Sequence, residues 1–584
     1  MMLYGNPARL ENAASVAASI STLLHRAGSM PSGIDRHAVL AHAFIRAGEL
    51  VQGIADAEFD RCGVDARSRM QDKGATLLLA MAVALDRSWR SNFREELSDI
   101  PLSLLRQLGS AGWISTRVGE GYAHYALYPE AYLEAARRSG LGSETLVIGI
   151  RSIGTSLGAL VAAALQARPA ISLRPVGHPF RREIRAEPGI LTIAASDSDL
   201  QFAVVDEGPG MSGSSFASVA RWLFDLGIGP AQIHFFSSHG NGPGEAAGRE
   251  IRAIWQGCRH HPALSCDFFD QTLKPCIESR LGSLEGALKP YSPTPSTPRD
   301  GRFERLKFST TTTHGRLLVK FAGLGDSGER KLRDAQTLAT EGFSPGVVGL
   351  CYGFLLQEHA TARRPGCTIH DRARFLQTLA SYLSFRAGGG LGPAGPGATV
   401  DTLRRMAIEN SLELLGPRFA STLECHLQRL SDAGAPARVV RTDNRLQSWK
   451  WLVTSDGFLK VDAVDHCEAH DLVGCQDIAW DIAGSIVEYR LSAAEAGAIC
   501  NAIRSAGGNV EPHLIATMLP CYLAFQSGLW GTATGAAAEA LARSYVHRLK
   551  SFLHLLPQYE SQTRSNDLRS TPAGTAPGFT TSRK

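Results

Sequence analysis

The stretch Val204-Val-Asp-Glu-Gly-Pro-Gly-Met-Ser-Gly-Ser-Ser215 joins an apolar run to two adjacent carboxylates and then to a loop of small residues. The apolar residues Phe202–Val205 predict a buried strand, and Phe216–Leu226 has the spacing of a helix. Ligands of an open α/β sheet bind at the carboxyl ends of its strands. The sequence therefore predicts that Asp206 and Glu207 lie at a ligand site on the edge of a sheet.

The loop after the acidic pair has the composition of a phosphate site. Main-chain N–H groups of a glycine- and serine-rich turn before a helix can bind a phosphate. Carboxylates cannot, but they accept hydrogen bonds from sugar hydroxyls. Together they indicate a ribose 5-phosphate site with Asp206 and Glu207 as the catalytic pair, although a plain polar turn is the alternative. The predicted phosphate loop consists of Gly210, Met211, Ser212, Gly213, Ser214 and Ser215.

Strands alternate with helices around this loop, which predicts a parallel α/β sheet. The other predicted strands are Thr145–Ile150, Leu191–Ala195 and Gln232–Phe236, and a helix is expected at Leu157–Gln166. A second polar turn follows the strand that ends at Ile150, and the guanidinium of Arg151 can present a planar fork to a phosphate. The predicted contacts of this turn are Arg151, Ser152, Gly154, Thr155 and Ser156.

The two turns, in this order, resemble those of type I phosphoribosyltransferases, over about residues 125–244. The linking residues Gly208-Pro209-Gly210 depart from the family, where an apolar pair is more usual. The resemblance implies phosphoribosyl pyrophosphate as substrate and Mg²⁺ as cofactor, with the turn at Arg151 holding pyrophosphate. It also implies that the basic segment Arg174–Arg185 is a mobile loop, with Arg181 and Arg182 as substrate contacts. A solvated charged loop is the alternative for these two arginines.

The second half of the chain carries another set of spaced motifs. Arg316-Leu-Leu-Val-Lys320 precedes Gly323-Leu-Gly-Asp-Ser-Gly328, and Arg441-Thr-Asp-Asn-Arg445 precedes Gly457-Phe-Leu-Lys-Val-Asp462. This order resembles the aminoglycoside phosphotransferase and choline kinase family, whose fold is α+β and like that of protein kinases. Two residues depart from that family: Ser448 replaces an asparagine metal ligand, and Arg441 replaces a histidine.

The second resemblance implies roles for particular residues in phosphoryl transfer. Lys320 would bind ATP phosphates, with Asp334 or Glu329 as its partner. Asp443 would be the catalytic carboxylate and Asp462 the Mg²⁺ ligand, and Asp477 or Asp481 would brace the catalytic loop. The alternatives are an edge-strand lysine at position 320 and turn residues at positions 443 and 462. The unit is then an active kinase, a divergent one, or a kinase-like fold used for binding.

Composition limits the class of protein. The chain has 584 residues, of which 44 % are hydrophobic and 20 % charged, with a net charge of +4. The small charge argues against a nucleic-acid partner, and no apolar run approaches the roughly 20 residues of a membrane span. Eleven cysteines without a CxxC pair indicate free thiols and a cytoplasmic protein. The expected partners are small-molecule substrates. The oligomeric state stays open, with a dimer as one option.

These patterns predict an α/β phosphoribosyltransferase-like domain behind a helical extension, followed by an α+β kinase-like domain. The expected order is an extension at 1–100, the first domain at 101–281, a linker at 282–300, the second domain at 301–557, and a tail without structure at 558–584. Helices are expected at Asp35–Phe59 and Gly74–Ala84. The predicted function is phosphoribosyl transfer to an unidentified acceptor. The alternatives are a small-molecule kinase and a regulatory protein that senses a nucleotide without turnover.

Overall fold

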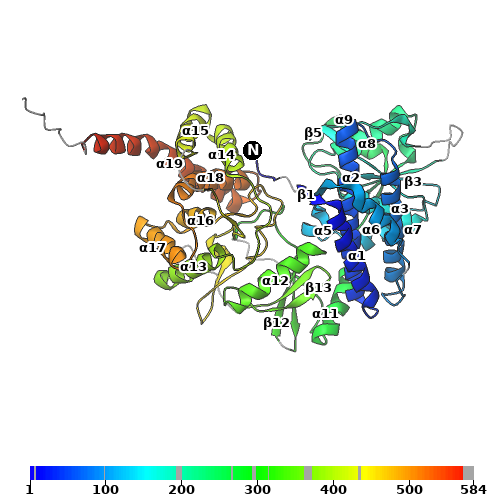
Figure 1. The fold of residues 1–584 in the computed structure, drawn as a ribbon, viewed down its shortest axis with the longest axis horizontal. Helices are drawn as coiled ribbons and strands as arrows, with labels where there is room; N and C mark the ends of the chain where they lie inside the picture. Colours follow the sequence, from blue (N-terminus) through cyan, green and yellow to red (C-terminus); the bar gives the residue numbers. More distant parts are fainter. Residues whose placement is uncertain are drawn as a thin grey trace, which may run out of the picture. The chain divides into compact units, whose positions relative to one another are not determined.

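The computed structural model describes residues 1–5, 8–97, 99–191, 200–264, 268–291, 297–313, 315–360, 371–431 and 436–569. The chain forms two compact units, and we describe each by itself (Figure 1). The sheet unit comprises Asn6–Ser292 and Arg305–Thr361, and the helical unit comprises Met1–Gly5, Pro293–Glu304 and Ala362–Lys584. Residues 305–361, which the sequence assigns to the kinase-like domain, thus belong to the sheet unit. The predicted domain boundaries stay predictions.

A five-stranded parallel sheet forms the centre of the sheet unit. Its strands run in the order β4 (Ile171–Leu173), β3 (Leu146–Ile150), β7 (Phe202–Val205), β8 (Ile233–Ser237) and β9 (Arg259–Pro262). The predictions for β3, β7 and β8 are confirmed, and β4 and β9 are additional. The predicted strand Leu191–Ala195 lies outside the described residues from position 192 onward. All four residues of β7 are buried, as expected for a central parallel strand.

Helix α7 (Gly154–Leu165) begins very close to the sheet, and α8 (Ser214–Asp225) follows the acidic pair. A Cβ atom at Gly149 would lie 2.0 Å from the main-chain oxygen of Gly154. A Cβ atom at Gly154 would lie 2.5 Å from the main-chain oxygen of Val205. Glycine is therefore needed at both positions, because the obstructing atoms are main-chain atoms.

The N-terminal helices belong to the core of the sheet unit. Figure 1 shows α1 (Ala13–Ser29), α2 (Ile34–Cys62) and α3 (Arg69–Arg90) in blue, and both α2 and α3 pack on α7. The side chain of Asn12 caps α1, and Gly63 ends α2 with a φ of +76°. The two predicted helices are confirmed as α2 and α3. A two-stranded antiparallel ribbon, β1 (Ala8–Asn12) and β2 (Trp113–Arg117), was not predicted.

A second, antiparallel sheet completes this unit. It has the order β10 (Lys289–Pro290), β11 (Lys307–Thr312), β12 (Gly315–Phe321), β14 (Phe354–Glu358) and β13 (Val347–Cys351), and α12 (Asp326–Thr340) follows β12. The motif Arg316–Lys320 lies in β12, and α12 begins within the motif Gly323–Gly328. Because β10 pairs with β11, part of the predicted linker belongs to this sheet. The remaining helices of the sheet unit are α4 (Leu102–Leu108), α5 (Glu120–His124), α6 (Pro129–Arg138), α9 (Arg249–Gly257) and α11 (Lys274–Leu281).

The helical unit is built around α16 (Ala479–Tyr489) and α18 (Pro512–Gly531), where Trp480 packs on Tyr522 and Phe525. Its other helices are α13 (Arg372–Ala387), α14 (Val400–Leu415), α15 (Pro417–Ser431), α17 (Ala493–Ser505) and α19 (Ala536–Arg569). Two short ribbons pair β15 (Val439–Val440) with β18 (Gln476–Asp477) and β16 (Trp451–Val453) with β17 (Phe458–Lys460). Helix α19 continues past position 558, where the sequence predicts the tail, and residues 570–584 lie outside the described residues.

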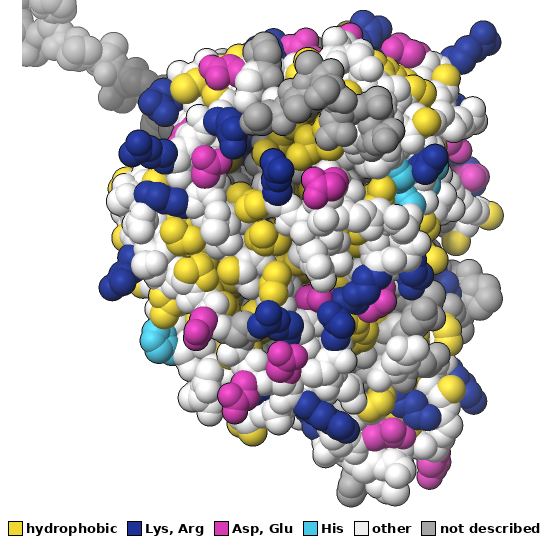
Figure 2. All heavy atoms as spheres, turned by 90° about the vertical axis from the view of Figure 1, so that its right-hand side faces the viewer, with side chains coloured by type: hydrophobic (Ala, Val, Ile, Leu, Met, Phe, Trp, Pro, Cys, Tyr) yellow, Lys and Arg dark blue, Asp and Glu magenta, His cyan; other side chains and the backbone are white. Residues whose placement is uncertain are grey.

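Basic and acidic side chains are interspersed on the face drawn in Figure 2. Among the described helices, we find none that combines the length and the apolar character needed to cross a lipid bilayer. The expectations about nucleic acid and compartment stay predictions.

The close approach of α7 to the sheet gives a direct test of the fold. We expect Gly149→Ala to lower the free energy of unfolding by at least about 3 kcal/mol, since main-chain atoms would have to move to relieve the overlap. Gly142→Ala is the control, because a Cβ atom there meets no atom within 4 Å. Thermal and urea denaturation of both variants measures the difference. Equal stability of the two would contradict the geometry of this turn.

Candidate functional site

A cavity of about 910 Å³ lies at the carboxyl end of β7, within the sheet unit. Its volume is within the roughly 300–1,000 Å³ of ordinary ligand sites. Asp206 and Glu207 line it from β7, Ser152 from the turn before α7, and His239 from the segment after β8. The acidic pair therefore directly follows a central strand and lines a cavity, while its role in binding a ligand stays a prediction.

Neighbouring elements hold the main chain of the acidic pair. The Asp206 N–H donates to the oxygen of Phe236 at 3.2 Å, and the hydroxyl of Tyr132 donates to the oxygen of Asp206 at 2.8 Å. The N–H of Gly121 donates to Oε2 of Glu207 at 3.0 Å. A Cβ atom at Gly121 would lie 3.0 Å from Cδ of Glu207, so the absence of a side chain permits this contact. The position of both carboxylates thus depends on α5, α6 and β8.

Three carboxylates share this side of the cavity. Burial raises the pKa of Asp206 to about 7. Burial, followed by repulsion from Glu120 and Asp206, raises the pKa of Glu207 to about 8. Burial also raises the pKa of Glu120, which lines the same cavity. Asp206 and Glu207 are therefore poised to ionise near neutral pH when a cation or a hydrogen-bond donor arrives.

The donor set fits Mg²⁺ in one respect, since carboxylate oxygens are hard ligands. Within the described part of the chain, however, no three His, Cys, Asp or Glu side chains are grouped so that they could hold a metal ion. A magnesium ion at Asp206 and Glu207 would thus take further ligands from the oxygens of a bound substrate.

Four arginines line the same cavity: Arg117 from the end of β2, Arg151, Arg174, and Arg182 from β6 (Arg181–Ile184). Burial lowers the pKa of Arg182, and the positive charges of Arg117 and Arg174 lower it further. Guanidinium groups that repel one another in this way attract a multiply charged anion, and each can bind phosphate oxygens in pairs. Arg174 already pairs with Asp60 at 3.0 Å and with Asp56 at 3.3 Å, so Arg117 and Arg182 are the arginines best suited to a pyrophosphate.

The prediction for Arg181 does not agree with this geometry. Its side chain is exposed, and Arg181 does not line the cavity. Successive residues of a strand point to opposite sides, which separates Arg181 from Arg182.

The structure gives Arg151 a different role from the predicted phosphate fork. Its buried guanidinium bonds to Asp56 at 3.2 Å and to the oxygen of Ser172 at 2.8 Å, and it forms an ion pair with Asp65. Arg151 therefore joins α2 to β3 and β4, although it also lines the cavity. The N-terminal helices thus support the site, which the sequence did not indicate.

Donor groups at the start of α7 already form hydrogen bonds with main-chain oxygens of the turn before it. The Thr155 N–H donates to the oxygen of Ser152 at 3.2 Å, and the Ser156 N–H donates to the oxygen of Ile153 at 3.1 Å. The hydroxyl of Ser156 also donates to the oxygen of Ile153. Gly154, Thr155 and Ser156 do not line the cavity, whereas Ser152 does. The predicted anion nest at Thr155 and Ser156 is therefore not formed in this structure.

The loop after the acidic pair divides into two parts. Gly210 and Ser215 line the cavity. The hydroxyls of Ser212 and Ser214 instead donate to the oxygen of Pro179, at 3.0 and 2.6 Å, which corrects their prediction as phosphate donors. Pro179 is at the tip of the antiparallel hairpin of β5 (Pro175–His178) and β6, in the segment predicted to be mobile.

The main chain of this loop retains donors for a phosphate. Gly210 and Gly213 have φ values of +59° and +66°, which turn the chain sharply before α8. The N–H groups of Met211 and Ser212 have no acceptor among the residues that the structure describes. Main-chain donors next to a helix N-terminus can bind an anion.

No sequence signal marks Arg117 or Glu120 as site residues. Both precede the first strand of the parallel sheet and reach the cavity through the packing of β2 and α5. His239 belongs to a polar segment after β8, a position typical of ligand contacts in parallel sheets.

In the helical unit, Asp481 braces the loop that carries Asp443. Its carboxylate accepts the N–H groups of Asp443 at 2.7 Å and Asn444 at 2.9 Å. Asp477 bonds elsewhere, to the N–H groups of Arg438 and Ala479. Of the two predicted candidates, Asp481 therefore contacts this loop.

Asp443 itself is buried and surrounded by cationic and hydroxyl groups. Its Oδ2 lies 3.0 Å from Nζ of Lys460 and accepts the hydroxyl of Tyr382 at 2.5 Å. Nη2 of Arg386 is 3.5 Å away. These contacts hold the carboxylate of Asp443 in place, and its burial leaves it little access to a substrate hydroxyl.

Asp462 is also paired, with Nζ of Lys450 at 2.7 Å from its Oδ2. This arrangement does not fit a magnesium ion, since the ammonium group occupies a carboxylate oxygen that the metal would need. The assignments of Asp443 and Asp462 stay predictions.

Lys320 and Asp334 lie in β12 and α12 of the sheet unit, and both are buried. Because β12 pairs with β11 on one side and β14 on the other, the alternative of an edge-strand lysine is wrong. Their roles in binding ATP stay predictions.

No protein-family model matches the chain, and neither does any curated protein. Solved structures match about half of it. Choline kinase LicA from Streptococcus pneumoniae is 16 % identical over 49 % of this chain and 99 % of its own, with a TM-score of 0.34. A type I macrolide 2'-phosphotransferase is 15 % identical over 49 % and 96 %, with a TM-score of 0.32.

A spectinomycin phosphotransferase in complex with ADP and spectinomycin is 11 % identical over 48 % of this chain and 92 % of its own, with a TM-score of 0.33. These three matches name kinases or phosphotransferases, and none names a phosphoribosyltransferase. TM-scores of this size do not establish a shared fold or function.

The raised pKa of Glu207 predicts a pH-dependent stability. Between the ordinary value of 4.5 and about 8, the folded protein holds more protons at this site than the unfolded chain. The free energy of unfolding therefore falls as the pH rises through this interval. At pH 8.5 we expect Glu207→Gln to be more stable than the parent by about 1–2 kcal/mol, a difference reduced by the partial exposure of the Glu207 side chain. Near pH 4.5 this difference should disappear.

Urea denaturation at the two pH values measures this difference. Glu245→Gln is the control, because Glu245 is exposed and does not line the cavity. A stability difference between Glu207→Gln and the parent that does not change with pH would contradict the electrostatic account of the acidic pair.

Proposed function

We propose that the sheet unit binds phosphoribosyl pyrophosphate with Mg²⁺ and transfers its phosphoribosyl group to a nucleophile. One observation carries the proposal. At the carboxyl end of a parallel sheet, a single cavity has the carboxylates Asp206 and Glu207 together with the guanidinium groups of Arg117 and Arg182. A sugar needs hydrogen-bond acceptors and a pyrophosphate needs cations, and this cavity supplies both.

The acidic pair acts on the ribose ring. Ionised Asp206 and Glu207 accept hydrogen bonds from the ribose hydroxyls and stabilise the positive charge that develops as the C1–oxygen bond breaks. The electron pair of that bond leaves with pyrophosphate. The nucleophile forms the new bond to C1 and loses its proton.

The arginines and the loop position the charged groups of the substrate. Arg117 and Arg182 stabilise the departing pyrophosphate, and bound Mg²⁺ supplies further neutralisation of its charge. The loop after the acidic pair, of which Gly210 and Ser215 line the cavity, binds the 5-phosphate through main-chain N–H groups. Such positioning lowers the entropic part of the barrier.

A regulatory protein that senses the same ligand would use the same contacts. The two functions differ in one product, because only the transferase releases pyrophosphate. Incubation with phosphoribosyl pyrophosphate, Mg²⁺ and a panel of nucleobases separates them. Binding without pyrophosphate release would favour the sensor.

The neighbours Arg181 and Arg182 provide a matched pair of variants for the proposal. We expect Arg182→Ala to weaken binding of magnesium phosphoribosyl pyrophosphate at least about tenfold, because a partly buried charge-assisted contact contributes about 1.5–3 kcal/mol. Arg181→Ala removes the same side chain from outside the cavity, and its affinity should stay within about twofold of the parent. Titration calorimetry measures both. Equal losses in the two variants would be inconsistent with a site inside the cavity.

A small-molecule kinase is the second candidate function, and the bracing of the Asp443 loop by Asp481 favours it. Catalysis would require Lys450 to leave Asp462 so that Mg²⁺ can bind there. We expect Mg²⁺-dependent ATP consumption in the presence of small alcohols, lost in Asp462→Asn because the metal ligand is removed. Asp456→Asn is the control, since Asp456 is exposed in the turn of the same hairpin. No ATP consumption by the parent, or full activity of Asp462→Asn, would rule out this candidate.

A further inference from the structure

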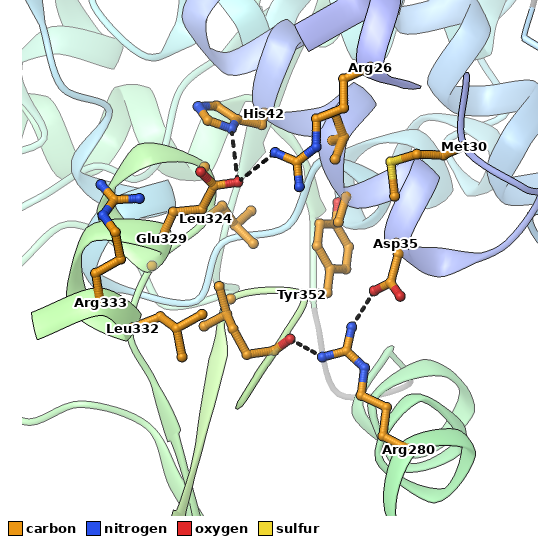
Figure 3. Close-up of a pocket in the computed structure, with 16 residues that line it drawn as sticks. Arg26, Met30, Asp35, His42, Arg280, Leu324, Glu329, Leu332, Arg333 and Tyr352 are labelled. Carbon is orange, nitrogen blue, oxygen red and sulfur yellow. Dashed lines mark hydrogen bonds and ion pairs between the residues drawn. The ribbon is translucent and has the colours of Figure 1, made fainter. Parts of the chain in front are cut away.

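A second cavity of about 450 Å³ lies in the sheet unit, and neither proposed function uses it. It shares no lining residue with the substrate cavity. Figure 3 shows side chains from α1 and α2 on one side and from the segment around α12 on the other. Its volume falls within the range of small-molecule sites.

The walls of this cavity are largely apolar. Val39, Leu324 and Tyr352 are buried residues that line it, and Leu332 and Leu350 extend the same wall. In Figure 3, the side chains of Leu324, Leu332 and Tyr352 surround the central space. A hydrocarbon or aromatic group placed there would leave water for an apolar environment, which is favourable.

One end of the cavity carries a fixed positive charge on His42. Its Nε2 lies 2.8 Å from Oδ1 of Asp326, and its Nδ1 lies 3.7 Å from Oε1 of Glu329. Burial opposes protonation, but these two carboxylates together raise the pKa of His42 to about 9. Gly325, with a φ of +60°, permits the approach, since a Cβ atom there would lie 2.9 Å from the imidazole ring.

Most of the other charged groups at this cavity are paired with one another. Arg280 bonds to Asp35 and to the oxygen of Leu350, and Arg26 lies 3.6 Å from Glu329. Figure 3 shows these pairs as dashed lines.

Arg333 is the exception among the lining cations. Its side chain is exposed, and its guanidinium makes no hydrogen bond or ion pair with any residue that the structure describes. Counted with protonated His42 and its partner Asp326, the cavity has four cations and three carboxylates, which leaves one excess positive charge. The excess disfavours a cationic ligand, and the unpaired guanidinium favours an anionic one over a neutral one.

We propose that this cavity binds a small amphipathic monoanion, a carboxylate or sulfonate with an aliphatic or aromatic body. The anionic group pairs with Arg333 at the rim. The body packs between Leu324, Leu332 and Tyr352.

Calorimetry on the full chain tests the proposal with three probes of equal length: octanoate, octan-1-ol and octylammonium. Octanoate should bind at least about fivefold more tightly than octan-1-ol. This ratio of affinities corresponds to the upper range of the free energy that an exposed ion pair contributes. Octylammonium should bind most weakly. Equal affinity for octanoate and octan-1-ol would overturn the assignment of an anionic ligand.

Two variants locate the binding. Arg333→Glu should remove the preference for octanoate over octan-1-ol, whereas Arg90→Glu should keep it, because Arg90 is an exposed residue away from this cavity. Ala38→Phe places a ring in the cavity from α2 and should weaken both octanoate and octan-1-ol, with unchanged binding of magnesium phosphoribosyl pyrophosphate. Full octanoate affinity in both Arg333→Glu and Ala38→Phe would overturn the proposal.

Discussion

Electrostatic repulsion between like charges inside one cavity is the interaction on which the proposed function depends. Asp206 and Glu207 are held together at the end of β7, and their proximity contributes to the raised pKa of Glu207. Arg117 and Arg174 likewise lower the pKa of Arg182. The acidic pair and Arg182 are each less stable in the charged form without a partner, so a ligand with hydroxyls and a pyrophosphate would stabilise both. Contacts with α5, α6 and β8 hold the acidic pair in place.

Local pattern was sufficient to predict the central strands and the position of the acidic pair. The apolar run of β7 and the small residues after it specify a strand, a turn and a helix in a short span. The contribution of Arg117 and the role of Arg151 could not be predicted in this way. Arg151 bonds to Asp56 and Asp65, which lie 95 and 86 residues before it in the chain. Such partners are set by the packing of α2 on the sheet, which residue spacing does not reveal.

A suitable residue type in a suitable place is also not enough to assign a role. Ser212 and Ser214 have the expected hydroxyls, but the oxygen of Pro179 accepts both, so the donors left for a phosphate are main-chain N–H groups. Asp443 has the expected carboxylate, but Lys460 neutralises it. In both cases the competing partner comes from a segment whose position depends on tertiary structure, and burial makes that partner difficult to displace.

The most direct test of the account is the affinity of the acidic pair for the proposed substrate. Titration calorimetry with magnesium phosphoribosyl pyrophosphate compares the parent with the double variant Asp206→Asn/Glu207→Gln, whose side chains keep their size and lose their charge. The account predicts saturable binding by the parent at pH 8.5 and a loss of at least about a hundredfold in the double variant, as expected when two charged acceptors are removed. Undiminished binding in the double variant would contradict it.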